Sequence, residues 1–530
     1  MNRLVLFLSI PLLVLACAGP RTKPAQSVSA ALEAHRPQYH FTPPAKWMND
    51  PNGLVWYEGE YHFFYQYFPD GTVWGPMHWG HAVSNDMVHW EHLPIALYPD
   101  TLGYIFSGSV VIDHQNTSGL GKNGKPAMIA LFTYHDMAAE KSGQRDWERQ
   151  GIAYSNDKGR TWEKYEENPV LPNPGGVRDF RDPKVLWHEG SRKWVMVLSV
   201  GDHTAFWGSP DLKKWSHLSD FGQNAGAHGG VWECPDLFPI KAADGKEKWA
   251  LLVNINPGAP NGGSGIQYFI GQFDGQKFIP DLEYIPGQPP AWLEYGRDNY
   301  AGVTWSNVPQ KDGRRLLIGW MSNWDYAMVV PTESWRSGAT LPRQLSLRKT
   351  SNGYRLYSNP VKELQELRET PVHNGPTAYS SRMALAGVDK AITPTLSEWI
   401  LEFDLTRTTA RSFGVELSNI GGERYRIGFD RMNNRFFSDR TQSGKIGFSP
   451  KFAEKIHFAP RFLNDSQVVL HLYFDVASAE LFADDGATVM TELFFPHTPY
   501  HQMSLFADGG TVQLVKAVGY GLSPVTFLNN

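Results

Sequence analysis

The sequence predicts an all-β protein, a five-bladed β-propeller followed by a β-sandwich. Three observations lead to this prediction. The 50 glycines and 37 prolines separate short runs that are rich in Val, Ile, Tyr, Phe and Trp, as is typical of strands and turns. A unit made of a turn and a tryptophan recurs along the first two thirds of the chain, and strands without that unit follow. With 530 residues the chain is too long for one ordinary core, which favours two domains.

Residues 1–17 predict an export signal. They combine a basic start with an apolar run that is shorter than the roughly 18 residues needed to span a bilayer. The run ends in VLAC, which resembles a bacterial lipobox and predicts a membrane tether through lipidated Cys17. Cleavage by an ordinary signal peptidase is the alternative. Residues 18–36 are small and polar, as a tether would be. We expect an exported protein, a periplasmic or cell-envelope lipoprotein or otherwise a secreted one.

Residues 37–350 predict the propeller. A four-stranded blade needs about 40 to 50 residues, so five blades with long loops fit this length. A β-sandwich would also give short strands, but it would not explain a turn-plus-tryptophan unit at this spacing. The unit occurs as Ser84-Asn85-Asp86 before Trp90, Ser155-Asn156-Asp157 before Trp162, Ser209-Pro210-Asp211 before Trp215, and loosely as Phe273-Asp274-Gly275 before Phe278.

Residues 351–371 predict a linker with a short helix that starts at Pro360, and residues 372–530 predict the sandwich. The expected sandwich strands are 399–405, 413–417, a hairpin around Asn433-Asn434, 468–474, 480–482, 491–495 and 503–506.

Composition excludes some function classes. The net charge of −5 gives no electrostatic footprint for nucleic acid or for an anionic membrane surface. No cofactor or metal is predicted, because His78, His81 and His89 lack the carboxylate or cysteine partners of a usual zinc site. Cys234 is expected to be a small buried apolar residue. The 19 tryptophans suit sugar stacking, although large β-proteins also use tryptophan as core filler. Oligomeric state is not predicted.

Three acidic residues stand in unusual local settings. Asp50 lies in WMNDPNG, Asp182 in FRDP and Glu233 in ECP. A proline follows each acid at one or two residues and biases the backbone before it toward extended geometry. Turn chemistry explains each segment taken alone. An unpaired carboxylate among apolar residues is costly, however, and this points to a function for Glu233.

Taken together, these motifs resemble those of glycoside hydrolase family 32, which comprises invertases, inulinases and levanases. The resemblance runs from about residue 37 to the C-terminus. Its segments are WMNDPNG (47–53), Gln66, FSGS (106–109), FRDPKV (180–185), ECPD (233–236), IGWMSNWDYA (318–327), PTESWRSGATLPRQLSL (331–347) and FDVASAELFADDG (474–486).

The resemblance implies a retaining glycosidase with two catalytic carboxylates. Asp50 would be the nucleophile and Glu233 the acid and base, with the pKa of Glu233 raised by apolar neighbours and by Asp50. Asp182 would accept hydrogen bonds from ring hydroxyls. The two catalytic carboxyls would lie roughly 5 to 5.5 Å apart. The implied fructose-binding residues are Asn49, Gln66, Trp74, Phe106, Ser107, Arg181 and Trp320, with core packing as the alternative for the two tryptophans.

The expected function is therefore retaining exo-hydrolysis of terminal β-D-fructofuranosyl residues from levan or inulin, with sucrose as a further substrate. One alternative is a fructosyltransferase, in which a sugar takes the place of water. A second is a related five-bladed enzyme that acts on arabinofuranosides or xylosides. The third is a non-catalytic, lipid-anchored fructan-binding protein.

Overall fold

The computed structural model describes residues 33–282, 290–388, 390–525 and 528–529. The predicted export signal with Cys17, and most of the predicted tether over 18–36, lie outside this range. The end of that tether packs on the fold, where the Arg36 guanidinium lies 4.8 Å from the ring centre of Trp335. In the described part of the chain, no helix is both long enough and apolar enough to cross a bilayer.

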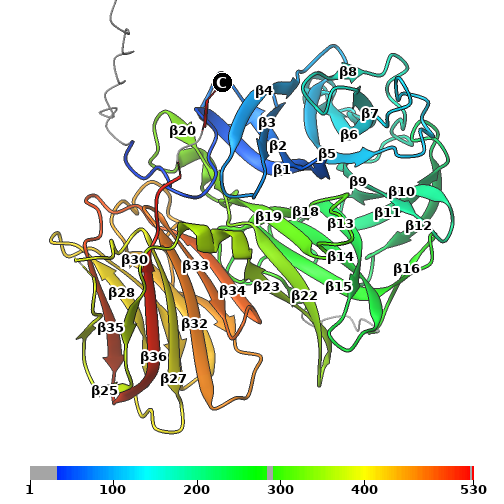
Figure 1. Ribbon diagram of the computed structural model, residues 1–530. Coiled ribbons are helices and arrows are strands. Elements are labelled where there is room, and N and C mark those ends of the chain that lie inside the picture. The colour runs from blue at the N-terminus through cyan, green and yellow to red at the C-terminus, as the bar shows by residue number, and fades with distance from the viewer. Residues whose placement is uncertain (1–32, 283–289, 389, 526–527, 530) are drawn as a thin grey trace, which may run out of the picture. The chain divides into compact units, whose positions relative to one another are not determined.

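Five antiparallel sheets follow one another along the first 360 residues and confirm the predicted five blades (Figure 1). Short additional strands extend three of them: β20 pairs with β1, β17 with β15 and β21 with β19. The sheets are β1 (Lys46–Tyr57), β2 (Glu60–Phe68), β3 (His78–Ser84) and β4 (Glu91–Leu97), with β20 (Trp335–Arg336) parallel to β1; β5 (Tyr104–Ile112), β6 (Met128–His135), β7 (Glu148–Ser155) and β8 (Glu163–Lys164); β9 (Phe180–His188), β10 (Lys193–Val200), β11 (His203–Ser209) and β12 (Ser216–Phe221); β13 (Val231–Lys241), β14 (Glu247–Asn256), β15 (Gly265–Phe273), β16 (Phe278–Pro280) and β17 (Ala291–Trp292); and β18 (Tyr300–Thr304), β19 (Arg315–Met321), β21 (Gly338–Ala339), β22 (Arg343–Thr350) and β23 (Gly353–Pro360).

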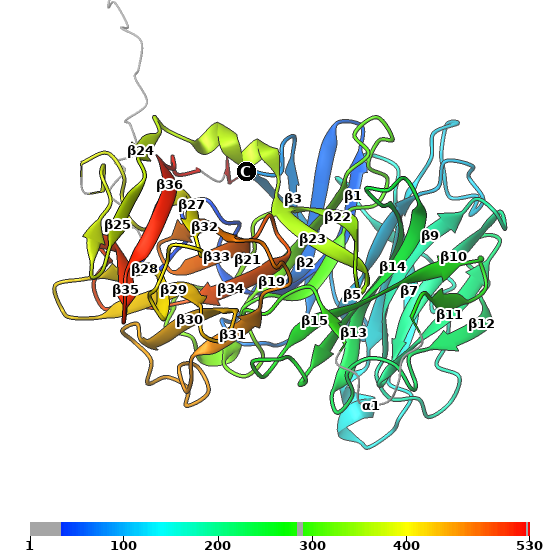
Figure 2. The same cartoon turned by 90° about the horizontal axis from the view of Figure 1, so that it is seen from below.

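The turn-plus-tryptophan unit is the connection between the third and fourth strands of a blade. In the first blade Asp86 Oδ1 accepts the backbone N–H groups of Val88 and His89, and the Trp90 indole donates to the Met87 carbonyl at 3.0 Å. The indoles of Trp162 and Trp215 make the same kind of bond in the second and third blades. The four strands of the third blade, β9 to β12, lie side by side in Figure 2. The sequence repeat therefore marks one structural position in successive blades.

The ring of blades closes where the chain beyond β18 meets β1. Ser306 N donates to the Leu54 carbonyl at 2.9 Å, and Trp56 N donates to the Ser306 carbonyl at 3.0 Å. The Ser306 hydroxyl also donates to the Val110 carbonyl of β5. One residue thus joins strands of the first and second blades to the chain that follows the fifth blade's innermost strand.

The boundary between the two domains differs from the prediction in its detail. The sequence placed the end of the propeller at 350, but β23 pairs with β22 and continues the fifth sheet to Pro360. The tight turn at Ser351-Asn352 allows this hairpin. The predicted short helix is the 3-10 helix η2 (Lys362–Leu367), which buries Leu364 and Leu367 and begins two residues after Pro360. The other helical segments of the described chain are α1 (Met137–Lys141) and η1 (Ala327–Val329).

Two stacked sheets form the sandwich, and each strand predicted from the sequence overlaps one of its strands. The hairpin at Asn433-Asn434 joins β29 to β30. The C-terminal β37 (Leu528–Asn529) returns to pair with β4 of the first blade. One sandwich sheet holds β24 (Val372–Asn374), β25 (Thr377–Tyr379), β36 (Val512–Gly521), β27 (Ser397–Asp404), β32 (Gln467–Asp475), β33 (Ser478–Ala483) and β34 (Thr488–Leu493); the other holds β26 (Met383–Ala384), β35 (Gln502–Asp508), β28 (Ser412–Ser418), β29 (Arg424–Asp430), β30 (Arg435–Gln442) and β31 (His457–Pro460).

A buried ion network joins the propeller to the sandwich. Arg343 of β22 contacts Glu294 at 3.1 Å and Glu480 of β33 at 2.6 Å, and all three side chains are inaccessible to solvent. Arg343 and Glu294 also bond the Thr491 hydroxyl of β34. Buried charges require pairing of this kind, because one unpaired member would carry the whole desolvation penalty.

We therefore predict that Arg343→Met destabilises the protein by about 3 to 5 kcal/mol, because Glu294 loses its buried cation and Glu480 is left with His40. Arg348→Met is the matched control. Arg348 lies on the same strand and pairs across the same interface with Asp485, but both side chains are exposed, so its loss should cost under about 1 kcal/mol. Urea unfolding followed by tryptophan fluorescence measures both. Equal effects of the two substitutions would contradict this account.

Candidate active site

The innermost strands of the five blades contact one another in sequence. β1 contacts β5, β5 contacts β9, β9 contacts β13, β13 contacts β18, and β18 contacts β1. Residues near the start of each strand therefore meet around one axis, although they are far apart in the chain.

Each of these innermost strands is irregular near its start. The ladder shifts register between Met48 and Pro51, Ile105 and Gly108, Arg181 and Lys184, Glu233 and Asp236, and Tyr300 and Val303. Such β-bulges leave residues unpaired and turn their side chains in new directions. All three acids lie inside or at the edge of one of these bulges.

Backbone strain accompanies the bulges. Asp182, Cys234 and Ala301 have φ values of 67°, 43° and 53°, in the left-handed region that non-glycine residues seldom adopt. Strain of this kind costs about 1 to 3 kcal/mol per residue and clusters at functional sites. Pro183 and Pro235 lie within two of the bulges. They have no N–H to donate, so they lose nothing where the ladder is interrupted.

The bulged ends surround a cavity of about 250 Å³. It contains all three acids and every predicted binding residue except Trp320. Its lining is Asn49, Asp50, Gln66, Trp74, Phe106, Ser107, His135, Glu140, Trp147, Glu148, Asp179, Arg181, Asp182, Glu233, Trp324 and Met328.

The Asp50 carboxylate is held by three donors. The Ser107 hydroxyl donates to its Oδ2 at 2.7 Å, and the Asn49 side-chain amide donates to its Oδ1 at 3.0 Å. Asn49 is itself fixed by the Trp47 indole at 2.7 Å. The Cys234 thiol lies 3.4 Å from Oδ2. These contacts orient the carboxylate toward one position.

Asp182 is more deeply enclosed. Its Oδ2 accepts the Cys234 N–H at 2.9 Å, and its own N–H donates to the Thr133 hydroxyl at 3.0 Å. Burial raises the pKa of Asp182 to about 8, against the opposing effect of the Arg181 cation and with the help of the charges on Glu233 and Asp50.

Glu233 lies between a cation and a phenol. Arg181 Nη2 donates to its Oε1 at 3.0 Å, and the Tyr300 hydroxyl donates to its Oε2. Burial raises the pKa of Glu233, and the nearby charge of Asp50 adds to this effect. The bonds from Arg181 and Tyr300 oppose it. The direction agrees with the expectation for an acid that keeps its proton.

Arg181 is shared among several acids. In addition to Glu233 it contacts Asp179 at 2.7 Å and Glu148 at 3.1 Å. The His135 ring also contacts Glu148, at 3.2 Å, and stacks on Phe106 with ring centres 4.2 Å apart. The guanidinium is thus fixed in place by carboxylates on more than one side.

Trp320 does not reach the cavity, so its expected place in the fructose-binding pocket is corrected. It lies on the second strand of its blade, β19, and its side chain has no exposed surface. Its ring packs behind the site against Trp324 at 4.9 Å, Trp47 at 6.1 Å and Tyr300 at 6.5 Å. Trp324, which lines the cavity, stands where Trp320 was expected.

The surroundings of Cys234, His81 and His89 indicate structural roles for these residues. Burial raises the pKa of the Cys234 thiol well above its usual value, and the neighbouring acids add to the effect, which disfavours a nucleophilic thiolate. His81 is buried and stacks on Phe64, whereas His89 is exposed beside Asp86. In the described part of the chain, no cluster of three His, Cys, Asp or Glu residues could hold a metal ion.

Sequence reasoning missed several residues of this site. Tyr300 and Glu148 make the bonds described above, and neither lies in a segment that was singled out. Tyr300 is the last paired residue before the bulge of the fifth inner strand, the position that Glu233 holds in the fourth. This equivalence between blades could have pointed to Tyr300 in the sequence. The fifth blade, however, lacks the turn-plus-tryptophan unit with which its strands could have been aligned to those of the other blades.

Several carboxyls in one cavity rimmed by tryptophan, two of them with a raised pKa, are typical of a glycoside hydrolase. Family models bear this out. Residues 40–360 match the Glycosyl hydrolases family 32 N-terminal domain, and residues 363–520 match the Glycosyl hydrolases family 32 C terminal. The chain belongs to glycoside hydrolase family 32.

Similar proteins come from bacteria and fungi. A levanase of Bacillus subtilis (strain 168) is 46% identical over 486 residues, which cover 91% of this chain and 69% of that protein. An extracellular exo-inulinase of Aspergillus awamori is 38% identical over 520 residues, 93% of this chain and 95% of that protein. The crystal structure of exo-inulinase from that fungus superimposes with a TM-score of 0.84 at 34% identity, covering 93% of this chain and all of the other.

Proposed function

We propose that the protein releases terminal β-D-fructofuranosyl units from levan or inulin, and fructose from sucrose, with retention of configuration. One observation carries the proposal: the acids of three different blades line one cavity, and one of them is held between a cation and a phenol. The names of its relatives, levanase and exo-inulinase, support the substrate class.

Asp50 is the proposed nucleophile. Ser107 and Asn49 both donate to its carboxylate, and these bonds fix its direction of attack on the anomeric carbon. We expect its carboxyl roughly 5 to 5.5 Å from that of Glu233, the spacing that double displacement requires.

Glu233 is the proposed acid and base. Its raised pKa keeps the proton available for the departing glycosidic oxygen. Once the fructosyl group has neutralised Asp50, one cause of that raised pKa is gone, and Glu233 becomes a base able to activate water. Arg181 and Tyr300 keep the carboxyl aimed at the bond throughout.

Asp182 is the proposed transition-state stabiliser. The Cys234 N–H donates to Oδ2 of Asp182, and the contacts of this carboxyl with Cys234 and Arg181 all involve Oδ2 rather than Oδ1. The carboxyl can therefore bond ring hydroxyls, and such bonds strengthen as the ring flattens toward an oxocarbenium-like state. Asn49, Gln66 and Ser107 add further polar groups for the same sugar.

The size of the cavity supports exo action. At about 250 Å³ it is smaller than the roughly 300 to 1,000 Å³ of pockets that hold drug-sized ligands. It suits one terminal sugar ring rather than the middle of a polymer chain. Trp74, Trp147, Trp324 and Met328 line it together with the acids and offer apolar surface to the ring.

Product analysis on levan, inulin and sucrose tests the proposal. Fructose alone should appear early from each polymer, and Asp50→Asn should lower kcat by on the order of 10⁴-fold. A ladder of oligomers would mean endo action. Longer oligosaccharides from concentrated sucrose would indicate a fructosyltransferase. Activity on aryl arabinofuranosides or xylosides without fructose release would favour the related five-bladed enzymes, and binding without turnover would favour a fructan-binding protein.

The pH dependence of Tyr300→Phe tests the role of Glu233. The Tyr300 hydroxyl lowers the pKa of Glu233, so its removal raises that pKa. An acid with a higher pKa keeps its proton to higher pH, and the alkaline limb of the kcat/KM profile should therefore move upward, together with a loss of rate. Tyr500→Phe, which removes a buried hydroxyl bonded to Ser443 in the sandwich, is the control. A limb that stays in place or moves downward in Tyr300→Phe would contradict the assignment.

We also propose that the protein is exported and tethered to a membrane by lipid on Cys17. The VLAC segment supports the tether, and the relative described as extracellular supports export. Cys17→Ser should move the protein from the membrane fraction to the soluble fraction, and an unchanged distribution would contradict the tether.

A further inference from the structure

A second cavity, of about 360 Å³, lies at the opposite ends of the same inner strands. Its walls include Ile112 of β5, Leu186 of β9, Phe238 of β13 and Thr304 of β18, each of which follows the bulge of its strand. None of its lining residues lines the catalytic cavity. A native interior holds few voids larger than a water molecule, so a hollow of this size calls for an explanation.

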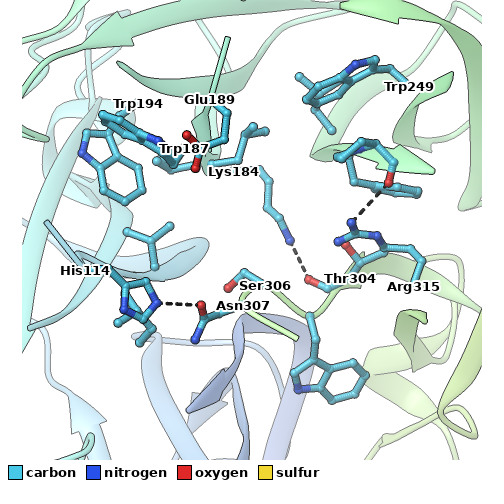
Figure 3. Close-up of a pocket in the computed structure, with 18 of the residues that line it drawn as sticks. His114, Lys184, Trp187, Glu189, Trp194, Trp249, Thr304, Ser306, Asn307 and Arg315 are labelled. Atoms are coloured by element: carbon cyan, nitrogen blue, oxygen red, sulfur yellow. Dashed lines mark hydrogen bonds between the residues drawn. The ribbon is translucent and has the colours of Figure 1, made fainter. Parts of the chain in front are cut away.

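A buried ion pair lies on the wall between the two cavities. Lys184, two residues after Asp182, lines the second cavity and donates to the Thr304 carbonyl at 2.6 Å (Figure 3). It also donates to Asp236 at 3.3 Å. Asp236 offsets the charge of this lysine. The pair therefore contributes no net charge to the second cavity.

Tryptophan rings line two sides of this cavity. Trp187 and Trp194 lie together, with ring centres 5.2 Å apart, and Trp249 lies across from them (Figure 3). Trp187 and Trp249 are only partly buried, so part of each side chain is open to solvent. Partly exposed tryptophans around a hollow offer the flat apolar faces that a ligand can stack on.

The polar groups of the cavity suit hydroxyls. The Arg315 guanidinium lies over the Phe238 ring at 4.9 Å and donates to the Pro239 carbonyl, and it makes no ion pair with any described residue. The side-chain oxygen of Asn307 accepts a bond from the His114 ring at 2.9 Å, and its amide nitrogen donates to the Trp56 carbonyl at 2.9 Å. An apolar wall with a few convergent polar groups is the usual make-up of a small-molecule site.

We propose that this cavity is a second, non-catalytic binding site for one or two furanose rings of a fructan chain. The inference rests on the proposed function for its ligand class. The C–H faces of the sugar would stack on Trp187 and Trp249, and its hydroxyls would bond Arg315 and Asn307. Such a site would keep the enzyme on a polymer between cleavages at the other end of the propeller.

Calorimetric titration with an inulin-type tetrasaccharide tests the site. The Asp50→Asn protein is used so that the sugar is not consumed. We expect two sites on this protein. Adding Trp249→Ala should weaken one of them at least about tenfold, because a stacking platform is lost. Trp207 is a partly buried tryptophan of the same propeller that lines neither cavity, so Trp207→Ala should leave the affinity of both sites unchanged. Arg315→Gln gives an independent variant if Trp249→Ala does not fold.

The outcomes separate this inference from the proposed function. Trp74→Ala should weaken the catalytic-cavity site alone. A single site that responds to Trp74→Ala and not to Trp249→Ala or Arg315→Gln would overturn the second site and leave the proposed function standing. A site that responds to Trp249→Ala, in a protein that releases no fructose from any substrate, would support the second site while removing the catalytic assignment. Competition by sulfate or by cello-oligosaccharides at that site would overturn its ligand class.

Discussion

Bringing three carboxyls, one buried and two partly buried, around one cavity is the constraint on which this structure depends. Each would be expensive to bury as an isolated ion, and their mutual repulsion adds to the cost. Arg181 provides the main compensation, since it contacts Glu233, Asp179 and Glu148 and lies near Asp182. The remaining cost appears as raised pKa values at Asp182 and Glu233. The same imbalance that destabilises the site raises the pKa of Glu233, as its proposed role as the acid requires.

The fold supplies what the charges require. A propeller brings the starts of five strands to one axis, and a bulge in each strand turns side chains toward that axis. The conformational strain at Asp182, Cys234 and Ala301 is tolerated because most of each blade is regular paired sheet. The sandwich contributes indirectly. Its residues Glu480 and Thr491 bond Arg343 of the fifth blade. The sandwich therefore supports the blade that carries Tyr300.

Much of this arrangement could be predicted from the sequence, because the relevant signals are local. Turn chemistry repeated at Asp86, Asp157 and Asp211 located three blades, and the proline after each acid marked where its strand is interrupted. The fifth blade and β23 were harder to delimit, because a tight hairpin at Ser351-Asn352 resembles a domain boundary in the sequence.

The remaining errors concern contacts across the ring. Trp320 and Trp324 are four residues apart and chemically alike, and only packing decides which one reaches the cavity. Tyr300 and Glu148 act through partners in other blades, Glu233 and Arg181, that sequence spacing does not reveal. The roles of Asp50, Asp182 and Glu233 stay proposals until chemistry tests them.

Trapping the covalent intermediate tests the central claim most directly. Glu233→Gln would be incubated with an aryl β-fructofuranoside whose leaving group departs without an acid, so that the first step proceeds and the second, deprived of its base, stalls. Peptide mass spectrometry of the acid-quenched digest should then find one fructosyl group on the peptide that contains Asp50, and none when Asp50→Asn is added. A label on the peptide that contains Asp182, or turnover with an inverted product and no label, would contradict the account.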